Sequence, residues 1–272
     1  MQPEQFQLHA DIEQRHWWFV ARRRIVGRLV GEVLPPGPDA VVVDVGCGTG
    51  ANIAALADRY DCAGIDTSDQ AVELARQRFP DVRFLIGRAP EDLGELMQQA
   101  RLFTLMDVLE HVDDDFAMLS ELLAAATPGS HFLLTVPAGD SLWTEHDESF
   151  GHYRRYDLDR FQRIWTDLPV APLLVSYFNA RLYPVVRLVR AINRKRGRAA
   201  GRVGTDFELP SRPVNWLLQS IFAGEARRLL DVLHGRKARA YRRGVSLVAL
   251  LRRQSGDIDI RRKPTDLPPD RR

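Results

Sequence analysis

The sequence predicts a doubly wound α/β fold, with a mostly parallel sheet of seven strands, helices on both faces and a helical insertion before the last strand. Three observations support this fold class. Short apolar runs typical of buried strands alternate with segments of helical periodicity. A turn with glycine at alternate positions follows the first of these runs. A long arginine-rich segment separates the last two apolar runs.

The elements can be assigned in order from apolar periodicity and from breaks rich in proline and glycine. We expect strands to alternate with helices, which favours a parallel sheet. The predicted strands are residues 40–45, 62–65, 82–86, 102–106, 131–136, 170–177 and 244–251. The predicted helices are residues 3–34, 51–59, 68–78, 116–126, 158–166, 182–192 and 214–233.

Composition is that of an ordinary globular protein with a sizeable core, because 45% of the 272 residues are hydrophobic and 27% are charged. The first residues have no basic segment followed by an apolar one, so no signal peptide is predicted. No uncharged apolar run is long enough to span a membrane. Cys47 and Cys62 fit a reducing compartment, and we expect a cytoplasmic protein, with peripheral contact at the inner face of the membrane as an alternative.

The overall charge of +2 conceals an uneven distribution. From Arg181 to Gly244 the chain has 16 Lys and Arg but only 4 Asp and Glu, so this segment carries +12 and the remainder −10. A basic segment on an acidic body indicates an anionic partner for that segment. A solvated helical face explains the same pattern.

The glycine turn carries most of the functional prediction. Gly46, Gly48 and Gly50 follow a buried strand, and this spacing differs from the G-x-G-x-x-G of dinucleotide-binding turns. Asp44 precedes the turn and suits a cationic ligand group better than a pyrophosphate. Asp66 ends the next strand, where a carboxylate can accept hydrogen bonds from both hydroxyls of a ribose.

This constellation, over residues 40–136, resembles class I S-adenosylmethionine-dependent methyltransferases, which have a Rossmann-like fold. Residues 13–24, EQRHWWFVARRR, are similar to a helix that precedes the domain in bacterial methyltransferases of type 11/12. The resemblance implies S-adenosylmethionine as cofactor and S-adenosylhomocysteine as product. A domain that binds a nicotinamide cofactor is the alternative. The cofactor residues implied are Asp44, Gly46, Cys47, Gly48, Thr49, Gly50, Asn52, Asp66, Thr67, Arg88, Ala89, Met106, Asp107 and Val108.

Within this resemblance, each segment has an expected role. The glycine turn would lie against the methionine part of the cofactor, and Asp66 would hold the ribose. Arg88 and Ala89 would flank the adenine, and residues 106–108 would lie near the methyl group. Methyl transfer to a hydroxyl also requires a base or a metal.

Histidines after the fourth and fifth strands are the candidates for that base. His111, His146 and His152 would reach the carboxyl edge of the sheet, and histidine titrates near neutral pH. The alternative is structural, with Glu110 and His111 capping the next helix.

The stretch from Asp107 to His111 also resembles metal-dependent methyltransferases of the ubiquinone pathway and small-RNA 2′-O-methyltransferases. There an acid-x-x-Glu-His group and a later histidine hold a divalent metal. Glu110 and His111 match this pattern, Asp107 replaces a glutamate, and His152 or His146 would be the later ligand. Such a set would suit Mg²⁺, Mn²⁺ or Zn²⁺.

Aromatic and basic residues outside the cofactor motif are candidates for covering the pocket or contacting the acceptor. Trp17 or Trp18 would stack near the sulfonium or exclude water, with Arg23 beside them. Trp143 and Tyr153 lie in a polar, aromatic segment after the fifth strand. Simple packing of these aromatics is the alternative.

The basic insertion mixes arginines with apolar residues at helical spacing, so one face of each helix must be buried. Three partners are open: the body of the domain, as a lid; a second copy, as a homodimer; or an anionic membrane surface and a lipid-linked substrate. Nucleic acid is not favoured, because no recognised nucleic-acid module is present.

The sequence therefore predicts an enzyme that methylates an oxygen or nitrogen of a small-molecule or lipid-linked metabolite. The alternative is a catalytically silent protein of the same fold that uses the insertion for membrane or partner contacts. The expected parts are a helical cap (1–36), the cofactor domain (37–178), the basic insertion (179–243), the last strand (244–253) and a disordered tail (254–272).

Overall fold

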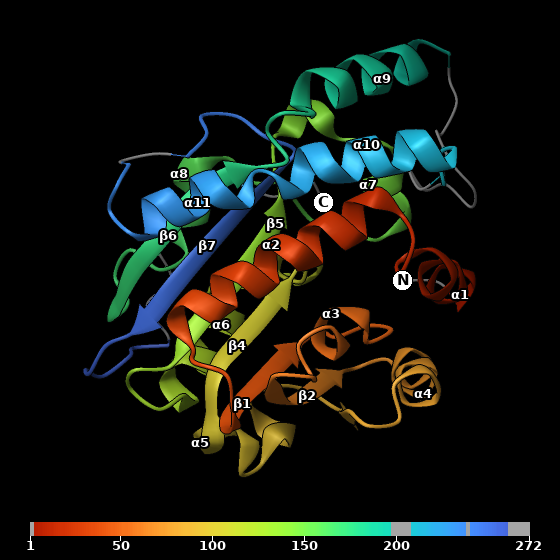
Figure 1. Ribbon diagram of the computed structural model, residues 1–272. Helices are drawn as coiled ribbons and strands as arrows, with labels where there is room; N and C mark the ends of the chain where they lie inside the picture. The colour runs from red at the N-terminus through yellow and green to blue at the C-terminus, as the bar shows by residue number, and fades with distance from the viewer. Residues whose placement is uncertain (1–2, 197–207, 238–239, 261–272) are drawn as a thin grey trace.

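One sheet of seven strands forms the centre of the molecule, in the order β3-β2-β1-β4-β5-β7-β6 (Figure 1). The computed structural model describes residues 3–196, 208–237 and 240–260. β7 runs antiparallel to β5 and β6, and the other pairs are parallel, so the predicted fold class is confirmed. The strands are β1 (Gly37–Val45), β2 (Tyr60–Asp66), β3 (Arg83–Ile86), β4 (Ala100–Met106), β5 (His131–Pro137), β6 (Val170–Phe178) and β7 (Ser246–Arg253).

Helices cover both faces of the sheet, because successive residues of each strand point to opposite sides and both sides are apolar. One core includes Ile25, Leu29 and Leu229. The other includes Phe116 and Phe161. The helices are α1 (Pro3–Ile12), α2 (Trp17–Val33), α3 (Ala51–Ala54), α4 (Asp69–Arg78), α5 (Leu96–Gln99), α6 (Asp115–Ala125), α7 (Glu145–Ser149), α8 (Leu158–Arg163), α9 (Tyr183–Arg196), α10 (Arg212–Ala223) and α11 (Ala226–Leu233).

The N-terminal segment is two helices rather than the single one predicted. The chain turns after α1, and His16 caps α2 by accepting a hydrogen bond from Trp18 N at 3.3 Å. Trp17 N donates to Asn215 Oδ1 at 2.9 Å, so the first turn of α2 is tied to α10. The break lets α1 lie across the end of the sheet at which α4 begins, while α2 runs along one face (Figure 1).

The predicted insertion is helical, but its second pattern is also broken in two. The break comes at Gly224 and Glu225, between α10 and α11. The buried Glu225 carboxylate accepts hydrogen bonds from the backbone N–H groups of Ala180 and Arg181, both at 2.8 Å. A continuous helix would not bring this carboxylate to the start of the insertion. α10 and α11 pack on α2, and α9 lies beyond them (Figure 1).

Parts of two predictions lie outside the described residues. These are residues 197–207 and 238–239 of the predicted basic insertion, and residues 261–272 of the tail predicted to be disordered. Among the helices that the structure describes, none has the length and apolarity needed to cross a bilayer.

Candidate functional site

The glycine turn follows β1, and two of its three glycines leave no room for a side chain. Gly46 and Gly50 have φ angles of 70° and 86°. A Cβ on Gly46 would lie 2.6 Å from Val108, and one on Gly50 would lie 2.7 Å from Phe84. Glycine is therefore required here both by backbone conformation and by close approach.

Two carboxylates lie next to this turn, and one of them is hydrogen-bonded to it. Asp44 is buried below it and accepts a hydrogen bond from Thr104 Oγ1 at 2.5 Å, while its Oδ2 has no partner among the described residues. Burial raises the pKa of Asp44 to about 7. Asp66, at the end of β2, accepts from Gly48 N at 2.8 Å and Ser68 N at 2.9 Å. Asp44 thus keeps an unsatisfied acceptor that suits a cationic group.

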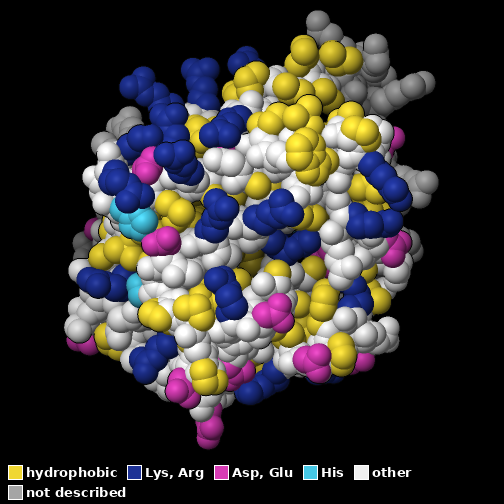
Figure 2. All heavy atoms as spheres, viewed as in Figure 1, with side chains coloured by type: hydrophobic (Ala, Val, Ile, Leu, Met, Phe, Trp, Pro, Cys, Tyr) yellow, Lys and Arg dark blue, Asp and Glu magenta, His cyan; other side chains and the backbone are white. Residues whose placement is uncertain are grey.

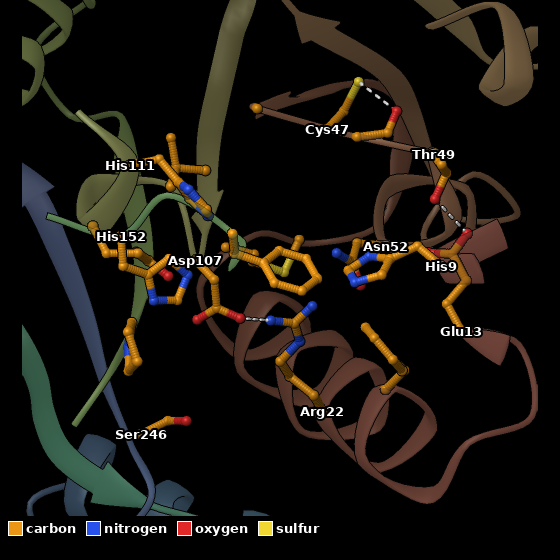
Figure 3. Close-up of a pocket in the computed structure, with 18 of the residues that line it drawn as sticks. His9, Glu13, Arg22, Cys47, Thr49, Asn52, Asp107, His111, His152 and Ser246 are labelled. Carbon is orange, nitrogen blue, oxygen red and sulfur yellow. Dashed lines mark hydrogen bonds and ion pairs between the residues drawn. The ribbon is translucent and has the colours of Figure 1, made fainter. Parts of the chain in front are cut away.

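A cavity of about 1910 Å³ opens at the carboxyl ends of the strands. It joins the glycine turn to the histidine-containing segments, so the predicted cofactor and acceptor regions share one space (Figure 3). Asp44 and Gly50 support the turn but do not line the cavity. The predicted cofactor residues that do line it are Gly46, Cys47, Gly48, Thr49, Asn52, Asp66, Thr67, Arg88, Ala89, Met106, Asp107 and Val108.

The N-terminal helices close one side of this cavity. Trp17 and Trp18 line it. Arg22 lies over the Trp18 ring, 4.2 Å from its centroid, and forms an ion pair with Asp107 at the end of β4 (Figure 3). Arg23, predicted beside the tryptophans, is not part of the lining, because it sits one position further round the helix. An ion pair therefore joins the N-terminal helices directly to the predicted cofactor site.

A second contact anchors the segment between α1 and α2. Glu13 is buried and accepts a hydrogen bond from Thr49 Oγ1 at 2.7 Å. Arg78, on α4, forms an ion pair with Glu13 and donates to Thr49 O at 2.8 Å. Sequence reasoning missed Glu13, Arg22 and Arg78 as parts of the site, although Arg22 lies one helical turn after Trp18.

Glu110, His111 and His152 converge at the opposite side of the cavity. Their potential ligand atoms all lie within 4.8 Å of one another. Glu110 is fully buried, and neither of its carboxylate oxygens has a hydrogen-bond partner in the part of the chain that the structure describes. Burial, and then the charge of Asp107, raises the pKa of Glu110 well above its usual value. Burial and the neighbouring His152 lower the pKa of His111 to about 3.

Asp107 does not join this cluster, although the metal-site resemblance implied a role for it. Its carboxylate is held by Arg22 and accepts a hydrogen bond from Thr135 Oγ1 at 3.1 Å. His146 also lies apart from the cluster, with its ring packed on Phe150 at a centroid distance of 4.4 Å. Burial lowers the pKa of His146 well below its usual value. Of the two later histidines, the structure brings His152 to Glu110 and His111.

Asp147, which sequence reasoning did not single out, orients His152. The fully buried carboxylate lies 2.8 Å from His152 Nδ1 and accepts a hydrogen bond from Arg155 Nε, also at 2.8 Å. Although burial alone would raise it, these contacts hold the pKa of Asp147 below its usual range. The fixed Nδ1 leaves the other ring nitrogen, Nε2, as the one available to the cavity.

Trp143 and Tyr153 do not line the cavity. Trp143 Nε1 donates to Glu148 at 3.2 Å, which holds the ring along α7. Tyr153 N donates to Glu110 O at 2.8 Å, so this residue positions the backbone of the cluster, while its ring lies against Arg154. Both residues therefore support the loop, and neither faces the cavity.

Asn179 is a further polar residue in the cavity that the sequence did not indicate. It directly follows β6, has a φ of 52°, and is 1% exposed. Neither its Oδ1 nor its Nδ2 has a hydrogen-bond partner among the described residues. Its position depends on β6 lying beside β7, which no local pattern signals.

Comparison with known proteins places this geometry in a family. Residues 16–181 match the model of a methyltransferase domain. Trans-aconitate 2-methyltransferase of Deinococcus radiodurans is 34% identical over 126 residues, which cover 44% of this chain and 46% of that protein. Ubiquinone biosynthesis O-methyltransferase of Coxiella burnetii is 33% identical over 92 residues, covering 32% and 39%. The chain thus spans less than half the length of these relatives.

Solved structures share the fold at low sequence identity. The plantazolicin methyltransferase BpumL in complex with SAH has a TM-score of 0.56 at 12% identity, over 93% of this chain and 90% of that one. A methyltransferase of Haloferax volcanii in complex with the Trm112 activator has a TM-score of 0.54 at 18% identity, over 92% and 98%. With the domain match covering more than half of the chain, the protein belongs to the methyltransferase-domain family, in agreement with the resemblance to class I S-adenosylmethionine-dependent methyltransferases.

Proposed function

We propose that this enzyme transfers the methyl group of S-adenosylmethionine to an oxygen or nitrogen of a small-molecule acceptor held beside His111 and His152. The observation that carries the proposal is that one cavity contains both the glycine turn and the Glu110–His111–His152 cluster. Relatives named for trans-aconitate and for ubiquinone biosynthesis support a small acceptor, and the latter name supports oxygen.

The residues of the turn fit the cofactor. Gly46 lines the cavity and allows a ligand to approach the backbone closely, and the buried Asp44 behind the turn adds an unpartnered acceptor close to that position. We assign Asp66 to the ribose, Arg88 and Ala89 to the adenine, and the end of β4 to the region of the methyl group. When bound, the cofactor supplies a methyl group already activated by a positively charged sulfur.

The chain's own residues then align the acceptor and accept its proton. The acceptor's lone pair forms the bond to the methyl carbon as the carbon–sulfur bond breaks, which requires the three atoms to lie in line. His152 Nε2 receives the proton that the acceptor releases, and Asp147 holds the imidazole at the angle that makes this transfer effective. Trp17, Trp18 and the Arg22–Asp107 ion pair exclude water.

A second candidate, favoured by the unpartnered Glu110 oxygens, is the same transfer assisted by a divalent cation. Glu110, His111 and His152 would hold Mg²⁺, Mn²⁺ or Zn²⁺, and their buried carboxylate and two imidazoles fit such an ion. The cation would lower the pKa of an acceptor hydroxyl. Asp147 would then orient a ligand rather than a base.

The test uses purified protein, labelled S-adenosylmethionine and a panel of hydroxyl, carboxyl and amine acceptors. Formation of labelled product and of S-adenosylhomocysteine supports the proposal, and cofactor binding without turnover on any acceptor contradicts it. Metal analysis before and after chelation, with Mg²⁺, Mn²⁺ or Zn²⁺ added back, separates the two candidates. Activity that survives chelation removes the metal-assisted route.

A further inference from the structure

Exposed hydrophobic side chains gather on the insertion. Ten large hydrophobic side chains of the described residues are prominently exposed, and eight of them lie between positions 185 and 217. Figure 2 shows hydrophobic side chains clustered along the top of the molecule, where Figure 1 places α9 and the far end of α10. We call this set the apolar face: Val185, Leu188, Val189, Ile192, Leu209, Val214, Trp216 and Leu217.

Packing among the described residues does not explain the apolar face. Leu188 is 61% exposed and Trp216 is 67% exposed, values far from those of the buried core. Asn215 lies between exposed residues of α10 and is hydrogen-bonded to the N-terminal segment. Its Oδ1 accepts from Trp17 N and its Nδ2 donates to Arg15 O, both at 2.9 Å. α10 therefore has its polar contact turned toward the body while Trp216 and Leu217 are turned to solvent. Such a patch on a protein surface marks an interaction site.

The charges around the apolar face indicate the kind of partner. Exposed arginines of the insertion include Arg212, one helical turn before Trp216 on α10, and Arg227 on α11. Lys and Arg side chains gather beside the apolar face in Figure 2. Two copies of the chain meeting at this face would bring like charges together. Nucleic acid would not satisfy the aliphatic side chains of α9, which neither stack on bases nor form hydrogen bonds.

An anionic bilayer satisfies both features of this surface. Apolar side chains of an interfacial helix enter the boundary between headgroups and acyl chains, while the basic residues beside them remain at the phosphates. Trp216 suits this boundary because its ring is apolar and its N–H is polar. The helices need not span the bilayer to bind in this way.

The apolar face also borders the mouth of the cavity. Val185, Val189 and Leu209 belong to the apolar face and line the same cavity as His111 and His152. Leu188 and Trp216 are not part of that lining. An acceptor held at the membrane by an acyl or polyprenyl chain would thus reach the histidines without leaving the surface.

We propose that α9 and α10 dock this enzyme on an anionic lipid bilayer and that the cavity takes its acceptor from the bilayer surface. The second half rests on the proposed methyl-transfer function and names a lipid-linked metabolite as the substrate class. The first half stands on the apolar face and its charges alone.

Vesicle flotation of the full chain tests the docking directly. The probes are vesicles of phosphatidylcholine alone and of phosphatidylcholine mixed with phosphatidylglycerol. We expect binding to the anionic vesicles that weakens with salt. Leu188→Glu and Trp216→Glu should each weaken binding by about tenfold or more, because each replaces an inserted apolar group by a charge. Arg212→Gln should weaken it by about fivefold.

Ile260→Glu is the matched control, since Ile260 is 43% exposed but lies outside the apolar face. It should leave vesicle binding unchanged. Unaltered cofactor-induced thermal shifts in Leu188→Glu would show an intact fold and cofactor site. Equal binding to neutral and anionic vesicles, no loss in Leu188→Glu, or a dimer in sedimentation that Leu188→Glu converts to monomer would overturn the docking proposal. Absence of turnover with every acceptor would instead count against the methyl-transfer function and leave the flotation result standing.

Discussion

The two sides of the cavity are built in different ways. The cofactor side comes from consecutive strand ends and one turn, and its critical residues are fixed by backbone geometry, such as the close approach of Gly46 to Val108. The acceptor side is assembled from four separated segments, around Glu110, His152, Asn179 and α9. The first side depends on local backbone geometry, whereas the second depends on how distant parts of the chain pack together. The two sides should therefore respond independently to substitution.

His152→Gln should have the largest effect, because it removes the group proposed to accept the acceptor's proton. We expect kcat to fall by about 100- to 10,000-fold, while the dissociation constant for S-adenosylmethionine, measured by calorimetry, stays within about twofold. His131→Gln, at the opposite end of β5, is the control and should behave as wild type. A matching loss of cofactor affinity in His152→Gln would mean that the two sides are coupled.

Asp44 should make the stability of the cofactor-free protein depend on pH. Its folded pKa, about 7, lies above the ordinary value of 3.8, so the folded state loses stability as pH rises from about 4 to about 7, and the penalty is constant above that range. The shift corresponds to a penalty on the order of 4 kcal/mol. Asp44→Asn should therefore unfold at a higher temperature than wild type at pH 8, and at a similar temperature near pH 4. An equal difference at both pH values would contradict this assignment.

Asp66→Ala should weaken cofactor binding by roughly 1–3 kcal/mol without changing which acceptors are used. The loss arises because the ribose hydroxyls lose their proposed acceptor and Gly48 N loses its own. Calorimetry measures the affinity. Asp69→Ala, which removes an exposed carboxylate at the start of α4, should have no effect. Unchanged affinity in Asp66→Ala would disprove the ribose assignment.

Asn179→Gly should have the smallest effect of the four substitutions. The effect should be limited to binding of the acceptor. Glycine tolerates the φ of 52° at this position, so the substitution removes the amide without straining the backbone. We expect the KM for the acceptor to rise by about tenfold, with cofactor affinity unchanged. Steady-state kinetics at saturating cofactor measure this change. If KM does not move, the unpartnered amide does not contact the acceptor.

The same contrast explains what the sequence could predict. The glycine turn, Asp44 and Asp66 stand in one short stretch whose spacing follows from strand and turn geometry, so their juxtaposition was predictable. The Glu110–His111 pair was visible for the same reason. Which later histidine would reach it was not predictable, because the choice depends on the buried contact between Asp147 and His152.

Other acceptor-side residues left no local signal. Asn179 reaches the cavity only because β6 pairs with β7, and Arg22 acts through an ion pair with a residue 85 positions away. The two helix breaks, at His16 and Glu225, were missed because neither changes the apolar periodicity. At His16 a side chain caps α2, and at Glu225 the carboxylate accepts a hydrogen bond from distant backbone.

The position of β7 has a consequence for how the chain is made. β7 follows the insertion in sequence, yet it lies between β5 and β6 and pairs with both, as in the contacts of Arg252 with His131 and Ala171. During synthesis, the edges of β5 and β6 that β7 will cover stay open until residue 253 emerges, and β6 has no other strand to pair with. The nascent chain thus carries two open strand edges beside an apolar, arginine-rich segment, and such edges template aggregation. Closure of the sheet has a high contact order and is expected to be the late, slow step of folding.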